Sequence, residues 1–153
     1  MFIHLKDIAI ILGGFIAVFT FVNGLLEYKR QGAQRRFEHF ITLRRRLKEN
    51  EAFKEICALL TENNPLLADY DSQSKRDFLG LMEEVAMLSN SGLIRKEVAH
   101  YMFGSYAIMC EDSAHFWHNV DRSDMYWTLF HDFAKNMKNE HISFTFKAHK
   151  LRY

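Results

Sequence analysis

The chain has 153 residues, of which 48% are hydrophobic, and its formal net charge is +1 at pH 7. This length supports one folded domain plus an N-terminal segment and excludes a second sizeable domain. The near-neutral total charge hides a local cluster of arginines and therefore says little about partners. The two cysteines, Cys57 and Cys110, lie far apart without CxxC or Cys/His spacing. This favours a reducing compartment over a disulfide scaffold, and we interpret both cysteines as core residues.

The first predicted element is a transmembrane helix. Residues 8–26 are 19 residues without a formal charge, which at about 1.5 Å per residue nearly span a hydrocarbon layer of about 30 Å. The segment runs directly into Glu27-Tyr28-Lys29-Arg30 rather than into a cleavage site, so we expect it to be retained. More basic residues follow it than precede it, which places residues 1–7 outside the cytoplasm and the rest of the chain inside.

Small and polar residues form a row along one face of this predicted helix. The row contains Gly13, Ala17, Thr20 and Gly24, with Asn23 beside it. Such a row lets helix backbones approach closely and predicts self-association, although small residues are also common in membrane helices in general. If several copies meet, Thr20 and Asn23 are the side chains able to wet a central path.

A basic amphipathic helix is expected next, over residues 27–64. Apolar residues recur at helical spacing until Asn63-Asn64-Pro65 ends the pattern. The helix carries five clustered arginines, which are Arg35, Arg36, Arg44, Arg45 and Arg46. They are suited to anionic lipid headgroups or to RNA phosphates. We favour headgroups and expect no direct nucleic acid binding, because no exposed aromatic platform lies between the arginines.

Residues 65–153 are expected to form a cytoplasmic helical domain. Asp71-Ser72 is a predicted N-cap for a helix over 74–91, a further helix is expected from Ile94 towards Val120, and Ser123-Asp124 is expected to cap the last helix. In the tail, 141–153, apolar and polar residues alternate briefly, but the pattern does not define a strand. The predicted fold class is therefore all-α: one N-terminal transmembrane helix followed by a cytoplasmic helical bundle that forms oligomers.

The strongest catalytic candidate is the pair Arg95 and His100, within Arg95-Lys96-Glu97-Val98-Ala99-His100. This R-x4-H spacing is the one found in HEPN ribonucleases, where the histidine transfers a proton and the arginine stabilises charge on the scissile phosphate. On a continuous helix, residues five apart point about 140° from one another, so a site needs two protomers. The alternative is a solvated helix face or an interface contact.

Two histidines at helical spacing are the only metal candidate in the sequence. His115 and His118 have Asp112 one turn before them and Asp121 one turn after them. Eight histidines in one chain make such pairs ordinary, and we predict neither a metal nor a cofactor. The sequence contains no Walker loop, dinucleotide fingerprint or nucleophile elbow, which disfavours a conventional soluble enzyme.

The combination of an N-terminal membrane helix, a small helical domain and the Arg95/His100 motif resembles a known family. These are the small HEPN-like membrane accessory proteins of type VI-B CRISPR systems, which target RNA. The stretch from Phe78 to Gly104 also resembles a bacterial membrane-anchored domain family of unknown function. The first resemblance implies a ring, with about eight subunits, in the bacterial inner membrane and functional coupling to an RNA-guided effector.

Three functions are consistent with these patterns. The preferred one is an oligomeric pore that depolarises the membrane and so enhances antiphage defence. The second is a membrane-tethered HEPN ribonuclease with Arg95 and His100 supplied by two protomers. The third is a non-conducting membrane adaptor that recruits a partner to the inner leaflet.

Overall fold

The computed structural model describes residues 2–143, with side chains described over 12–28, 30–32 and 34–139. Within this part of the chain every regular element is helical, as the all-α prediction requires. The chain divides into two units, Met1–Glu38 and His39–Tyr153. The tail beyond residue 143 and the side chains of residues 1–7, the predicted extracytoplasmic end, lie outside the described residues.

The predicted transmembrane helix and the single-pass inner-membrane location are wrong. Among the described residues, no helix combines the length and the apolarity that crossing a bilayer requires. The segment lies in helix α1 (Phe2–Glu49), which continues from Glu27 as a strongly charged helix.

The predicted basic rod is two helices rather than one. Helix α1 ends at Glu49, and α2 (Glu51–Thr61) begins after Asn50, whose side-chain oxygen accepts a hydrogen bond from the Phe53 amide at 3.2 Å. This N-cap satisfies a free amide of α2 and lets the chain change direction. The predicted stop at residues 63–65 is present: Asn63 has a φ of 47° and Asn64 caps the short helix η1 (Pro65–Leu67).

Helix α3 (Ser72–Asn90) forms where the sequence predicts it. The Asp71 carboxylate accepts a hydrogen bond from the Ser74 amide at 2.7 Å, which confirms the predicted cap. Ser74 also donates from its hydroxyl, and these two bonds lower the pKa of Asp71. The apolar face of α3 is fully buried at Phe78, Leu81 and Met82.

The helix expected over residues 94–120 consists of four successive elements, of which the first three follow one another without a break. They are α4 (Lys96–Ala99), the π-helical turn η2 (His100–Gly104), α5 (Ser105–Asp112) and α6 (Ala114–Trp117). Ser113 breaks the run because its hydroxyl accepts a hydrogen bond from the Phe116 amide at 3.2 Å. After η3 (Met125–Trp127), whose first turn Asp124 caps as predicted, α7 (Thr128–Ser143) completes the unit.

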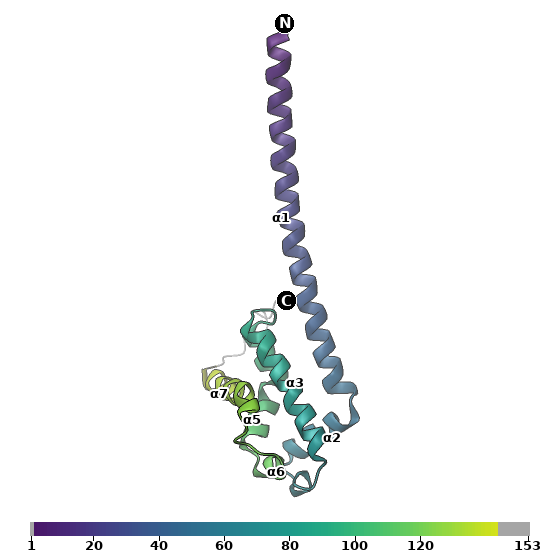
Figure 1. Ribbon diagram of the computed structural model, residues 1–153, viewed down its shortest axis with the longest axis vertical. Helices are drawn as coiled ribbons and strands as arrows, with labels where there is room; N and C mark the ends of the chain where they lie inside the picture. Colours follow the sequence, from purple (N-terminus) through teal and green to yellow (C-terminus); the bar gives the residue numbers. More distant parts are fainter. Residues whose placement is uncertain (1, 144–153) are drawn as a thin grey trace. The chain divides into compact units, whose positions relative to one another are not determined.

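Aromatic packing holds this second unit together. Helix α7 packs against both α3 and α5 (Figure 1). Phe78 lies edge-on to Phe53 of α2 with ring centroids 5.6 Å apart, and it also contacts Phe116 of α6 at 6.1 Å. One ring on α3 thus joins three helices, and burying such a ring is worth a few kcal/mol.

Candidate functional site

Two cavities are lined by opposite sides of the last turns of α1. Successive helix residues point about 100° apart, so three consecutive arginines separate: Arg45 and Arg46 line one cavity, and Arg44 lines the other. We call the first the paired cavity and the second the basic cavity. Both lie wholly within the second unit.

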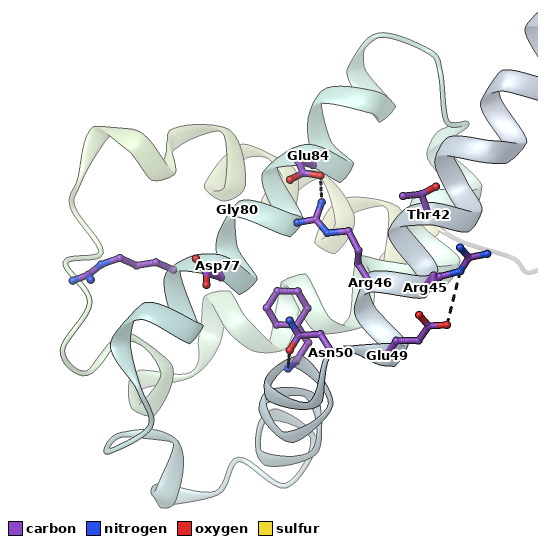
Figure 2. Close-up of a pocket in the computed structure, with 10 residues that line it drawn as sticks. Thr42, Arg45, Arg46, Glu49, Asn50, Asp77, Gly80 and Glu84 are labelled. Carbon is purple, nitrogen blue, oxygen red and sulfur yellow. Dashed lines mark hydrogen bonds and ion pairs between the residues drawn. The ribbon is translucent and has the colours of Figure 1, made fainter.

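The paired cavity, of about 570 Å³, balances its own charges. Its lining includes three arginines and three carboxylates, which are Arg45, Arg46, Arg76, Glu49, Asp77 and Glu84. Figure 2 shows Arg46 of α1 in an ion pair with Glu84 of α3, while Arg45 reaches Glu49 along its own helix at 3.8 Å. This cavity is therefore explained by the attachment of α1 to α3 and leaves no excess charge for a ligand.

The basic cavity is larger, at about 760 Å³, and lies between α1, α2, η2 and α5. It is lined by Arg44, Leu47, Lys48, Lys54, Cys57, Ala58, Thr61, Tyr101, Met102, Ser105 and Tyr106. Three of these residues are cationic, and none of the described lining residues is a carboxylate. Lys54 pairs with Glu51 at 2.7 Å. Arg44 and Lys48, one helical turn apart, make no ion pair within the described part of the chain.

The remaining lining groups add no opposing charge at neutral pH. Burial raises the pKa of the Cys57 thiol to about 12, so it stays protonated. Burial, and to a smaller extent the nearby Cys57, also raises the pKa of the Tyr106 hydroxyl. Thr61 donates its hydroxyl hydrogen to the Cys57 carbonyl at 2.8 Å. The cavity therefore combines positive charge with a neutral wall, which is a combination suited to an anion.

The two residues of the HEPN-like motif lie in different surroundings. Arg95 is exposed at the N-cap position of α4, whereas His100 is buried at the start of η2. The His100 ring lies close to Gly104, since a Cβ built there would be 3.2 Å from the imidazole Cδ2 and 3.4 Å from Met137 Sδ. Within one chain, the motif does not form an open pocket, and a site shared between protomers stays a prediction.

The histidine pair considered as a metal candidate does not converge on a metal position. His118 Nδ1 lies 3.2 Å from the Ala68 carbonyl oxygen, while the Asp121 carboxylate accepts hydrogen bonds from the Ser123 hydroxyl and amide at 2.7 and 2.9 Å. These bonds, the hydroxyl first, lower the pKa of Asp121. Across the described residues, no group of three or more histidine, cysteine or acidic side chains is placed to hold a metal ion.

An ionic cluster that the sequence did not indicate joins α5 to α7. Glu111 forms an ion pair with Arg122, and its carboxylate also lies 2.8 Å from His131 Nδ1. The other ring nitrogen, Nε2, lies 3.0 Å from the Arg122 carbonyl oxygen, and Trp117 stacks beside the ring at 5.4 Å. Both ring nitrogens of His131 therefore face acceptor atoms of the protein. The cluster fastens the loop before α7 to α5, and it does not leave a histidine nitrogen open for catalysis.

The predicted packing residues of α1 are all exposed. Gly13, Ala17, Asn23 and Gly24 are open to solvent, and a Cβ added at either glycine meets no atom within 4 Å. Thr20 donates its hydroxyl to the Ile16 carbonyl at 2.8 Å, within its own helix. Of the two arginines nearer the N-terminus, Arg35 is exposed and Arg36 is half-buried.

Comparisons with known proteins identified no relative. No protein-family model matches the chain, and neither curated proteins nor solved structures gave a match.

Proposed function

We propose that this chain is a homo-oligomeric assembly protein, in which the N-terminal parts of several α1 helices pack together and hold several copies of the second unit in one particle. The observation that carries the proposal is the exposure of apolar side chains from Leu12 to Leu26. A pore needs a helix that spans the bilayer, and none of the described helices is suited to do so. Assembly does not need one.

The exposed apolar surface is large enough to drive association. Nine large side chains are 46–72% exposed, namely Leu12, Phe15, Ile16, Val18, Phe19, Phe21, Val22, Leu25 and Leu26. A helix that is apolar on every side is normally buried. Covering each of the nine by half stabilises the assembly by about 1 kcal/mol, or roughly 9 kcal/mol in all, which is comparable with the estimated cost of about 4–15 kcal/mol for association.

A second copy of the same helix is the partner that fits this surface best. The row of Gly13, Ala17, Thr20 and Gly24 lets two backbones approach closely, and the larger side chains on either side then interlock. Because apolar residues surround the row, one contact leaves further apolar surface for additional copies. Bringing copies together also raises the local concentration of the second unit for any shared target.

Cysteine cross-linking tests this arrangement. Ala17→Cys lies in the small-residue row, and Val22→Cys lies about 140° around the helix from it. We expect Ala17→Cys to form intermolecular disulfides faster than Val22→Cys under mild oxidation, read on non-reducing gels. The native thiols provide a silent background, because Cys57 and Cys110 are buried and burial raises both pKa values. Equal, slow cross-linking of both variants would contradict the proposal.

A ribonuclease is the second candidate, and one observation favours it. The π-helical turn begins at His100, and such turns are frequent at functional sites. If oligomers bring Arg95 and His100 of different copies together, His100→Ala abolishes RNA cleavage while assembly persists. A wild-type oligomer that leaves RNA intact would remove this candidate.

A role beside an RNA-guided CRISPR effector is carried only by the sequence resemblance. It predicts that phage plating on cells with the effector falls further when this chain is also produced. An unchanged plating efficiency would remove the role and leave the assembly proposal intact.

A further inference from the structure

We infer that the basic cavity is a binding site for a nucleoside phosphate, with Arg44 and Lys48 holding the phosphate and Tyr101 facing the base. The inference is independent of the proposed assembly, because every lining residue belongs to the second unit of a single chain.

The phosphate side rests on the two cations from α1. Arg44 and Lys48 are four residues apart and so project from one face of the helix. The described part of the chain supplies no carboxylate partner to either residue. A guanidinium and an ammonium on one wall can donate several charge-assisted hydrogen bonds to one phosphate group. Lys54 adds positive charge across the cavity, although it shares that charge with Glu51.

The base side rests on the aromatic wall. Tyr101 is 57% exposed, and Tyr106 and Met102 lie half-buried in the same lining. An exposed tyrosine ring is a stacking surface for any nucleobase. The exposed Ser105 lies in the same lining and supplies a hydroxyl for a sugar or base edge. The volume of about 760 Å³ lies within the usual range for small-molecule sites, about 300–1,000 Å³.

The paired cavity explains why charge alone does not make a site. Its arginines face an equal number of carboxylates, and the pairs Arg46–Glu84 and Arg45–Glu49 compete with any incoming anion. Arg45 is adjacent to Arg44 in sequence and lies on the same helix, but it lines the other cavity. It is therefore a matched control for the loss of one positive charge.

The test is calorimetric titration of the full chain with ADP and with inorganic pyrophosphate at low ionic strength, where anion binding is least screened. We expect ADP to bind saturably at one site per chain and more tightly than pyrophosphate. Arg44→Gln and Lys48→Gln should each weaken ADP binding about tenfold or more, because each removes charge-assisted hydrogen bonds. Arg45→Gln should leave binding unchanged, and Tyr101→Leu should weaken ADP but not pyrophosphate.

Three results would overturn the inference. They are the absence of saturable ADP binding to the wild type, an equal loss in Arg45→Gln and Arg44→Gln, and pyrophosphate binding at least as tight as that of ADP. All four substitutions are at exposed or half-buried positions, so thermal melts matching the wild type are expected and separate a binding defect from misfolding.

Discussion

Helix α3 and the N-terminal part of α1 are both rich in large apolar side chains, but they are covered in different ways. In α3, Phe78, Leu79 and Leu81 are fully buried by other helices of the same unit. In α1, by contrast, Phe15 and Phe19 are 72% and 70% exposed. Residue type is therefore not what separates the two helices. The difference is that α3 has partners within its own chain, whereas the described residues of unit one offer α1 none.

Truncating one phenylalanine in each region gives the largest expected contrast. Phe78→Ala removes the ring that joins α2, α3 and α6, so it should lower the free energy of unfolding by about 3–5 kcal/mol. Phe19→Ala should leave the unfolding of the second unit unchanged and weaken self-association instead. Denaturant melts and sedimentation measure the two effects separately. Equal destabilisation of unfolding by both variants would remove the distinction.

A buried lysine extends the comparison from apolar to charged side chains. Lys75 of α3 is fully buried, and its Nζ donates to the carbonyl oxygens of Ala68 and His118 at 3.1 and 2.9 Å. Lys75→Met leaves both oxygens without this donor and should cost about 1–3 kcal/mol. Unit two can enclose a cation because its own backbone supplies the acceptors.

The pH dependence of the same variant checks the electrostatics. Burial lowers the pKa of Lys75 from its usual value of 10.5, so the unfolded chain binds more protons in the window just below that value. The stability of the wild type relative to Lys75→Met should therefore rise with pH through this window. The raised pKa of Tyr70, about 12, acts in the opposite direction but is common to both proteins and cancels in the difference. A flat or falling difference would contradict the assignment.

The smallest effects are expected at the paired cavity. Arg45→Gln breaks an exposed ion pair along one helix and should cost no more than about 0.5 kcal/mol. Arg46→Gln breaks the link between α1 and α3 and should cost more, up to about 1 kcal/mol, because it joins two helices. Thermal melts of the two variants compare the stability lost with each ion pair. A larger loss in Arg45→Gln than in Arg46→Gln would show that the link to α3 is not the stronger contact.

Local signals in the sequence predicted local structure well. The caps at Asp71 and Asp124 and the stop before Pro65 depend on side chains that bond to the nearest turn, so short patterns reveal them. The apolar periodicity likewise located α3 and α7. These features require no knowledge of distant residues.

Features that depend on distant residues were missed or misread. Asn50 and Ser113 interrupt helices inside patterns that stay periodic, so the expected helices ran too long. The Glu111 cluster joins residues 11 and 20 positions away. Helical geometry separates Arg44 from Arg45, but the cavity that each one lines depends on which helices pack on each side of α1. The membrane prediction was based on the length of the uncharged run at residues 8–26. Such a run does not specify whether lipid or protein covers the helix.

The most direct test of the central claim is the mass of the full chain in solution, measured by sedimentation equilibrium over a range of concentrations. The account predicts a particle of several chains that shifts towards one chain in Phe19→Ala. A wild-type protein that has the mass of one chain at every concentration would contradict the account.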